Sequence, residues 1–222
     1  MEGLRVDFEY KYENERKSDF YKFCKRGIDV IVAGVGLILL SPIITIVACA
    51  IKLTSKGPIF FLQKRVGKNG ELFNMYKFRS MVVNAEELKE KLKHKNEMSG
   101  PMFKMKDDPR VTKVGKFIRK TSLDELPQLF NILRGDMSLV GPRPERPFFV
   151  EKFREEIPRY MVKHQVRPGL TGWAQVNGYR GDTSIKKRID CDLYYIENWS
   201  IGFDIKILFL TVFKGFVNKN AY

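Results

Sequence analysis

Two adjacent acidic residues, Asp124 and Glu125, stand in a basic stretch of the sequence and are the side chains best suited to chemistry. Four cationic residues flank the pair: Arg119, Lys120, Arg134 and Arg143. A carboxylate can attack phosphorus as a nucleophile when neighbouring cations neutralise the charge of the phosphate that it approaches. The pair is therefore a candidate catalytic centre for chemistry at phosphorus.

Helix capping is the competing interpretation of the same two residues. Apolar residues recur at helical spacing after the pair, and Pro127 is tolerated only in a first turn, so the helix is expected to begin near Asp124 or Glu125 and to end at Gly135. Asp124 would then be the N-cap, or Ser122 and Glu125 would form a capping box. Capping is the commoner role of an isolated Asp-Glu pair. The surrounding cations, and the affinity of a helix N-terminus for phosphate, favour the catalytic interpretation.

An apolar run at residues 30–51 is the element that would bring this centre to a membrane. Only Ser41 and Thr45 carry polar side chains in it, and about 20 apolar residues suffice to span a bilayer. The Ser41-Pro42 pair predicts a helical break, whose freed backbone must be satisfied by the Ser41 hydroxyl or by neighbouring protein. Basic residues at both ends of the run leave two arrangements open, a kinked spanning helix and a helix that returns to the side it entered from.

The overall charge favours anionic partners. The chain has 40 basic and 26 acidic residues, a formal net charge of +14, which suits phosphates, acidic lipids or nucleic acid. No nucleic-acid fold signature is present, so nucleic acid is not expected as a partner. The three scattered cysteines indicate neither a disulfide framework nor a metal cluster. A noncatalytic, membrane-anchored protein that binds polyanions explains the charge equally well but gives no reason for the acidic pair.

The remaining segments supply the elements around the pair. Residues 57–81 read as a β-hairpin that turns at 67–70, and residues 85–96 read as a solvated helix. A further amphipathic helix is expected from Pro147. Residues 166–181, rich in glycine and polar side chains, are expected to form a functional loop rather than core.

Polar and aromatic residues at the two ends of the chain are expected to have structural or interfacial roles. Asp29 begins the apolar run, and Arg26 lies three residues earlier on the same helical face, so the two are expected to form an ion pair. The C-terminal segment places Tyr194, Tyr195 and Trp199 beside a short apolar stretch, a pattern typical of a helix in the membrane interface.

At this point several blocks together resemble one family. KRGIDV, the Ser41-Pro42 pair, YKFRSM, KFIRKTSLDELPQLFNILRGDMSLVGPRP and RPGLTGWAQVNG resemble the bacterial sugar transferases, the monotopic phosphoglycosyl transferases, from about residue 25 to 215. The resemblance implies a mostly helical α+β fold with a re-entrant, Pro-bent helix, a small β-hairpin and interfacial amphipathic helices. It implies a charged arm at 1–24, the re-entrant helix at 25–52 and a catalytic domain at 53–222.

The resemblance also implies a reaction. Asp124 would attack the sugar-bearing phosphate of a UDP-sugar, release UMP and hold the phosphosugar until polyprenyl phosphate accepts it. Asp124 and Glu125 would also hold Mg²⁺ with the substrate phosphates, with Glu125 left open to act on the lipid phosphate instead. The implied substrate-binding residues are Arg119, Lys77, Arg79, Arg143 and Pro144.

The same resemblance implies where the protein acts. It would lie on the cytoplasmic face of the bacterial inner membrane, in contact with lipids, and a homodimer is left open. By analogy the RPGLTGWAQVNG block suits the transfer of glucose or galactose in exopolysaccharide or capsule initiation. The short region before the apolar run is expected to make this the minimal catalytic form.

Overall fold

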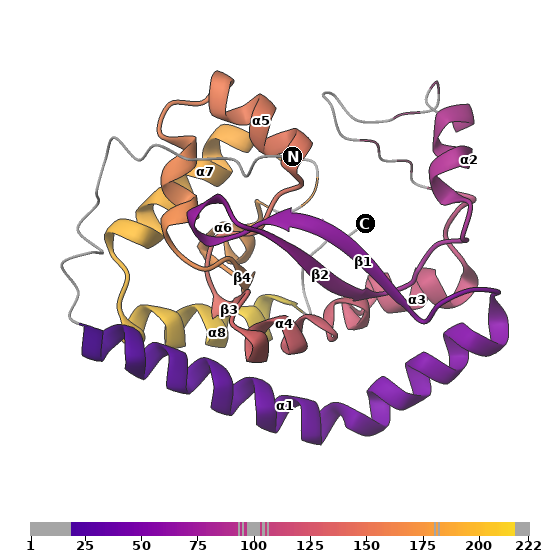
Figure 1. The fold of residues 1–222 in the computed structure, drawn as a ribbon, viewed down its shortest axis with the longest axis horizontal. Coiled ribbons are helices and arrows are strands. Elements are labelled where there is room, and N and C mark those ends of the chain that lie inside the picture. The colour runs from indigo at the N-terminus through magenta and orange to yellow at the C-terminus, as the bar shows by residue number, and fades with distance from the viewer. Residues whose placement is uncertain are drawn as a thin grey trace.

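A computed structural model of the chain describes residues 19–92, 94, 96, 103, 105, 107–179, 181 and 183–215. The expected arm at 1–24 therefore lies mostly outside the described residues. Figure 1 shows one long helix along one side of the molecule, with the shorter elements stacked against it. In chain order the elements are α1 (Asp19–Thr54), β1 (Phe60–Val66), η2 (Lys68–Gly70), β2 (Leu72–Phe78), α2 (Ala85–Leu92), α3 (Lys113–Lys120), η4 (Leu123–Glu125), α4 (Gln128–Arg134), β3 (Ser138–Val140), α5 (Pro147–Glu156), η5 (Tyr160–Gln165), β4 (Gly169–Thr171), α6 (Trp173–Val176), α7 (Ile185–Glu197) and α8 (Ile201–Gly215).

The helix α1 continues through Pro42, so the expected helical break is wrong. Proline has no N–H to donate to the carbonyl four residues earlier, which here belongs to Ile38. The Ser41 hydroxyl, one of the two donors that the sequence left open, donates to that carbonyl oxygen at 2.8 Å instead. The ribbon of α1 is bent rather than broken (Figure 1).

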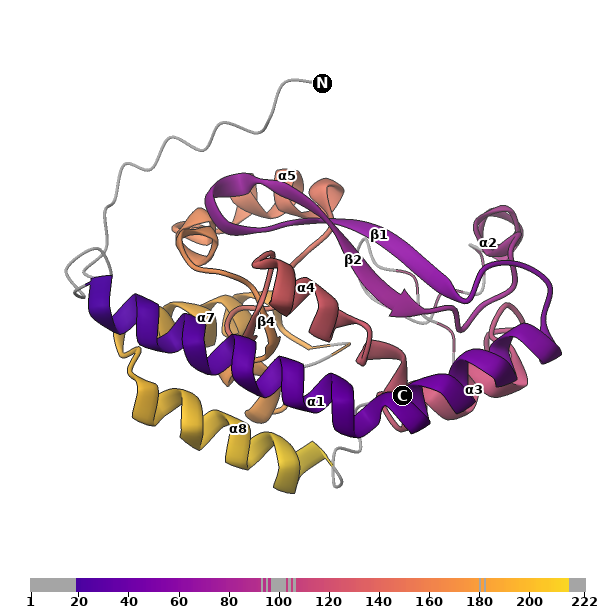
Figure 2. The same ribbon diagram turned by 60° about the horizontal axis from the view of Figure 1, so that its bottom comes forward.

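The outer surface of α1 is apolar and exposed. Its most apolar 18-residue window has a mean hydropathy of 2.7, and only 11% of that window is buried, so α1 is long and apolar enough to cross a membrane. Helix α8 lies beside it (Figure 2). Large apolar side chains are exposed on α8 as well: Ile205, Phe209, Val212 and Phe213. Together these surfaces and the family described below indicate membrane association.

The hairpin forms where the sequence predicts it. Strands β1 and β2 pair antiparallel, from Phe60 opposite Phe78 to Val66 opposite Leu72, and η2 makes the turn. Met75 and Phe78 of β2 point to opposite faces of the hairpin and join two separate apolar cores. The helix predicted over 85–96 is present as α2 from Ala85 to Leu92, and the helix predicted from Pro147 is present as α5.

A second strand pair corrects the interpretation of residues 166–181 as a loop. Strand β4 pairs in parallel with β3, and α6 follows it, with Val176 buried in the main core. A Cβ at Gly169 would lie 2.1 Å from the backbone nitrogen of Gly141, so only glycine permits this approach of the two segments. Glycine in this segment therefore allows close backbone packing and does not indicate a mobile loop.

The prediction that the aromatic residues before α8 lie in the membrane interface is also corrected. Tyr195 and Trp199 are buried, whereas Tyr194 is half exposed. The Tyr195 hydroxyl and the Trp199 indole N–H donate to the carboxylate of Asp204, at 2.7 and 3.0 Å, and Lys25 of α1 pairs with the same carboxylate at 2.6 Å. Two of the three expected interfacial aromatics therefore bind α8 from α7 and from the residues after it, and Lys25 joins the same carboxylate to α1.

The expected ion pair between Asp29 and Arg26 is wrong. The Asp29 carboxylate, 2% exposed, accepts hydrogen bonds from the Ser138 hydroxyl and the Leu139 backbone N–H, both at 3.0 Å. Arg26 donates to two carbonyl oxygens in the last turn of α4, at 2.6 and 2.8 Å. Each group instead satisfies backbone or hydroxyl groups of the elements that pack on α1.

Candidate active site

The acidic pair lies in a turn before a helix, not at its cap. Asp124 and Glu125 belong to the 3₁₀ turn η4, and α4 begins only at Gln128. Pro127 cannot donate to the Leu123 carbonyl, which instead accepts from the backbone N–H of residue 126 at 3.2 Å. This bond tightens the chain ahead of the proline into a 3₁₀ turn.

Both capping interpretations are therefore wrong. Ser122 has a left-handed backbone, with φ of 56°, and its side chain makes no capping hydrogen bond, while the position before α4 is occupied by Pro127. The expected end of the helix is confirmed, because Gly135 follows α4 with φ of 95°. The acidic pair therefore precedes α4 and does not occupy its N-cap position.

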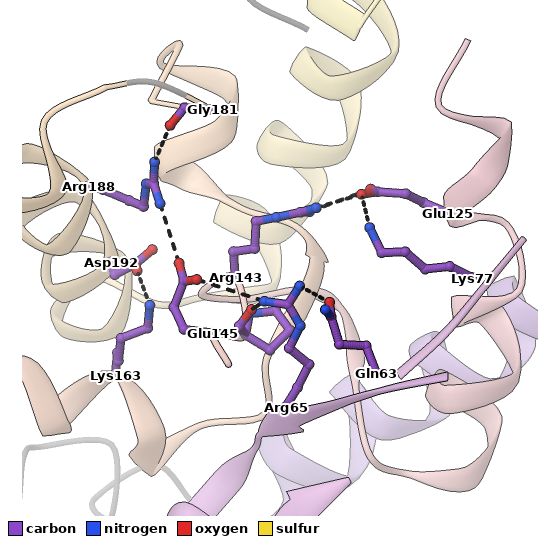
Figure 3. A network of polar contacts seen from close by, with 11 residues as sticks. Gln63, Arg65, Lys77, Glu125, Arg143, Glu145, Lys163, Gly181, Arg188 and Asp192 are labelled. Atoms are coloured by element: carbon purple, nitrogen blue, oxygen red, sulfur yellow. Dashed lines mark hydrogen bonds and ion pairs between the residues drawn. The ribbon is translucent and has the colours of Figure 1, made fainter. Parts of the chain in front are cut away.

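Glu125 is held by two cations that come from different elements. Lys77 of β2 donates to Oε1 at 3.0 Å. Arg143, in the loop after β3, donates from Nη2 to the same oxygen at 2.5 Å and from Nη1 to Oε2 at 3.5 Å. Figure 3 shows Arg143 reaching the carboxylate from the left of the view and Lys77 from below it.

The site is largely buried and its charges act on one another. Glu125 and Asp124 are 7% and 9% exposed. Burial lowers the pKa of Lys77, and the Glu125 carboxylate opposes that shift. The charge of Glu125 raises the pKa of Arg143, and Asp124 is near enough to raise the pKa of both cations to a lesser degree. Lys77 and Arg143 are thus held beside both carboxylates as donors that a phosphate can also bind.

Asn131 fixes β2 against α4 and thereby sets where Lys77 meets Glu125. It is fully buried, and its side-chain oxygen accepts from the Tyr76 backbone N–H at 2.9 Å. Its amide nitrogen donates to the Asn74 carbonyl at 2.8 Å and to the Asp136 carboxylate at 3.0 Å. Nothing in the spacing of the sequence marked this residue as part of the site.

Arg119 and Arg79 lie outside the clamp that Lys77 and Arg143 form on Glu125. Arg119, in the last turn of α3, donates to the Ser80 hydroxyl at 2.8 Å and stays partly exposed. Arg79 is buried, and its terminal nitrogens donate to the carbonyls of Ser55 and Lys56 at 2.6 to 2.8 Å. These bonds give Arg79 a structural role at the end of α1, and its binding to substrate stays a prediction.

Arg134 is close to the acidic pair in the sequence but does not contribute its charge to the contacts around Glu125. Its side chain is 62% exposed and lies at the far end of α4 from the acidic pair, where it pairs with Asp136 at 3.6 Å and reaches the Tyr76 hydroxyl at 3.3 Å. Arg143, also flanking the pair in sequence, does reach Glu125. Arg134 is thus at the C-terminal end of α4, whereas Arg143 reaches the acidic pair that precedes the N-terminal end of the same helix.

Sequence reasoning missed a buried charged network behind Arg143. Arg65 donates to the backbone carbonyl of Pro144 at 3.1 Å, so Pro144 takes part through its backbone. Glu145 and Arg188 pair at 3.3 Å, and Figure 3 shows these residues packed behind the loop. Arg65 looked like one of many basic residues in the hairpin, and only Glu145, next to the prolines, offered any local signal.

A Mg²⁺ ion fits the acidic pair only together with substrate. Within the part of the chain that the structure describes, no group of three or more His, Cys, Asp or Glu side chains is arranged to hold a metal. Mg²⁺ in phosphate chemistry is commonly bound by one or two carboxylates plus phosphate oxygens and water. Asp124 and Glu125 match that smaller requirement, although Lys77 and Arg143 already bind Glu125.

Comparison with known families and proteins matches nearly the whole chain. The sequence model of the family described as "Bacterial sugar transferase" matches residues 20–218. The chain is 49% identical over 205 residues to the UDP-glucose:undecaprenyl-phosphate glucose-1-phosphate transferase of Escherichia coli K12, covering 90% of this chain and 42% of that protein.

Two further relatives differ in the sugar that their names give. A UDP-N-acetylgalactosamine-undecaprenyl-phosphate N-acetylgalactosaminephosphotransferase of Aeromonas hydrophila is 47% identical, covering 94% of this chain and 48% of that protein. An undecaprenyl-phosphate galactose phosphotransferase of Salmonella typhimurium is 44% identical, covering 90% and 42%. The chain thus spans less than half the length of each of these relatives, and similar identities accompany three different sugars.

Proposed function

The chain belongs to the bacterial sugar transferase family, and from this premise we propose that it transfers the sugar-1-phosphate of a UDP-sugar to undecaprenyl phosphate. The names of the relatives supply both substrates. The observation that carries the proposal is the clamp on Glu125, in which two cations from distant segments are held beside a second carboxylate. The product would be the lipid-linked sugar that starts the assembly of a polysaccharide.

In the proposed first step, a carboxylate oxygen of Asp124 attacks the phosphorus that bears the sugar. A bond forms from that oxygen to phosphorus, the bridging P–O bond to UMP breaks, and UMP leaves with the bonding electron pair. In the second step a phosphate oxygen of the lipid attacks the same phosphorus and the Asp124 carboxylate is released. Both steps bring negative groups together, so the nearby cations are needed to lower the repulsion.

Lys77 and Arg143 are proposed to bind the diphosphate, and Arg119 is proposed to add a third contact at the edge of the site. Glu125 keeps the first two cations in place until the substrate arrives. Mg²⁺ bound by the acidic pair and the phosphates would supply further charge neutralisation. The arrangement of charges also argues against a simple polyanion-binding protein, for which a buried carboxylate between two cations would be counterproductive.

We also propose that the site lies at the cytoplasmic face of the bacterial inner membrane, with α1 re-entrant and α8 in the interface. The lipid substrate and the water-soluble nucleotide sugar must meet at such a boundary. Helices α1 and α8 lie side by side in Figure 2, and the exposed apolar side chains that both carry support this placement. The Ser41 hydroxyl bond satisfies the carbonyl that Pro42 frees, which a bent helix in lipid needs whether it spans or returns, and the family resemblance is what favours the re-entrant form.

The test uses protein purified in detergent with Mg²⁺, polyprenyl phosphate and a panel of UDP-sugars, and measures the release of UMP. The wild type is expected to release UMP, with about one equivalent per protein when the lipid acceptor is omitted. Asp124→Asn should abolish release, whereas Asp190→Asn, which removes the same charge from the exposed surface of α7, should not. Release that survives Asp124→Asn would refute the covalent mechanism.

A transferase that joins the two substrates directly is the enzymatic alternative. It predicts no UMP before the lipid is added and no adduct. Mass spectrometry of protein incubated with the donor alone separates the two mechanisms, because only the covalent route gives a phosphosugar mass on the peptide that contains Asp124.

A further inference from the structure

The loop that carries Arg143 is anchored on its N-terminal side by the parallel strand pair. The backbone N–H of Gly141 donates to the Thr171 carbonyl, and the N–H of Gly169 donates to the Pro142 carbonyl, both at 2.9 Å. The ring of Pro142 also restricts its own backbone. The main chain is therefore fixed immediately before Arg143.

The C-terminal side of the loop is anchored to the hairpin. Val66, the last residue of β1, donates from its backbone N–H to the Glu145 carbonyl at 3.0 Å. Arg65 donates from Nη1 to the Pro144 carbonyl at 3.1 Å and from Nη2 to the Gln63 side chain at 2.5 Å. Burial lowers the pKa of Arg65 to about 10, which still leaves its guanidinium charged at neutral pH.

The side chain of Glu145 joins this anchor to α7. Its carboxylate lies 3.3 Å from Nη1 of Arg188 and 3.9 Å from Nη1 of Arg65, and the residue is 8% exposed. Arg188 in turn donates from Nη2 to the Gly181 carbonyl at 2.9 Å. Figure 3 shows Glu145 pointing away from Glu125 while Arg143, two residues earlier, points toward it.

We propose that Glu145 is a positioning residue for Arg143: by tying the Pro142–Glu145 loop to Arg65 of β1 and Arg188 of α7, it holds the Arg143 guanidinium where it binds the diphosphate of the nucleotide sugar. This inference rests on the proposed function, since it assigns Arg143 to phosphate. Glu145 itself does not touch the substrate. Its effect on binding is transmitted entirely through Arg143.

The direction in which Glu145→Gln changes the Kd of UDP separates a positioning role from a general electrostatic one. Glu145→Gln removes a negative charge close to the site, so an effect of field alone would strengthen the binding of an anion. Loss of positioning would weaken it, because Gln is too weak a partner to hold two guanidinium groups. The two explanations therefore predict opposite changes in the dissociation constant for UDP.

The experiment is a double-mutant cycle on UDP binding, measured by isothermal titration calorimetry on the full chain in detergent. Glu145→Gln is expected to raise the Kd of UDP about tenfold in the wild-type background and less than about twofold in an Arg143→Ala background. Asp108→Asn, which breaks the buried ion pair to Arg110 beside the start of α2, is the matched control and should act equally in both backgrounds. Arg65→Lys, which keeps the charge but loses the guanidinium fork that binds the Pro144 carbonyl and Gln63 together, should reproduce the coupling if Glu145→Gln does not fold.

Tighter binding of UDP by Glu145→Gln, or an equal loss in both backgrounds, would overturn the inference. Absence of UDP binding by the wild type would overturn it too. Release of UMP is measured in parallel on the same variants. A cycle that shows coupling in UDP binding while the wild type releases no UMP would reject the proposed reaction and support the positioning role.

Discussion

The contact between β2 and α4 at Asn131 gives a sharp test of how the site is held. Asn131→Asp preserves the shape of the side chain and the oxygen that accepts from the Tyr76 backbone N–H. It removes the two N–H donors, so the Asn74 carbonyl is left without its 2.8 Å partner and the Asp136 carboxylate faces a second carboxylate instead of an amide at 3.0 Å.

The expected cost follows from those contacts. The lost hydrogen bond to the Asn74 carbonyl is worth about 1 kcal/mol and the one to the charged Asp136 about 1.5–3 kcal/mol, so we expect a loss of about 3 kcal/mol or more. For a chain of this size that corresponds to a fall in Tm of roughly 6–12 °C. Because Lys77 follows Tyr76 in β2, the movement should also disturb the contact with Glu125 and lower kcat/KM for UMP release.

The penalty should depend on pH with a definite sign. Burial and the neighbouring Asp136 raise the native pKa of the introduced carboxyl group above its unfolded value of about 3.9. Between these two values the native state binds more protons than the unfolded state, so stability falls as pH rises and recovers as pH falls. The deficit relative to wild type, followed by thermal melting, should therefore be larger at pH 8 than at pH 5.

Asn198→Asp is the matched control, because Asn198 is exposed and its side chain donates to a single carbonyl. It should change Tm by no more than about 2 °C. If Asn131→Asp melts like this control and keeps the wild-type kcat/KM, then the asparagine does not position the site and the reasoning is refuted.

Three further perturbations test the fold. Burial lowers the pKa of His164 to about 3, well below its unfolded value of about 6.5. Between these two pH values the unfolded state binds more protons than the folded state, so the free energy of unfolding falls as pH drops, by at most about 1.4 kcal/mol per pH unit. His164→Phe should flatten this slope in urea titrations. Ser41→Ala leaves the carbonyl three residues earlier without its donor and should cost about 1 kcal/mol, measured by thermal melting in lipid nanodiscs. Gly115→Ala would place a Cβ 1.9 Å from the Ser80 carbonyl oxygen and should lower Tm by several degrees and weaken UDP binding, whereas Gly27→Ala, with nothing within 4 Å, should not.

Each of these has a contrary result. An unchanged pH slope in His164→Phe would mean that the imidazole titrates normally in the folded protein. A Ser41→Ala variant as stable as wild type would mean that the freed carbonyl finds another donor. Equal melting of Gly115→Ala and Gly27→Ala would show that α3 can move from Ser80 without cost.

The sequence determined the features that depend on neighbours along the chain. The hairpin at 60–78, the start of α5 at Pro147 and the end of α4 at Gly135 follow from turn chemistry and fixed backbone angles, which act over a few residues. The hydroxyl bond of Ser41 is of the same kind, because its acceptor lies three residues away. The motif blocks likewise indicated the family, and the comparison confirmed it.

Only the tertiary structure decided which charges meet. Lys77 and Arg143 reach Glu125 across 48 and 18 residues of chain, whereas the nearer Arg134 is carried to the opposite end of α4. Asp29 binds residues more than a hundred positions away rather than Arg26 on its own helix. Partners of this kind depend on the pairing of β3 with β4 and the packing of α4 on β2, and a cation count along the sequence carries no information about either.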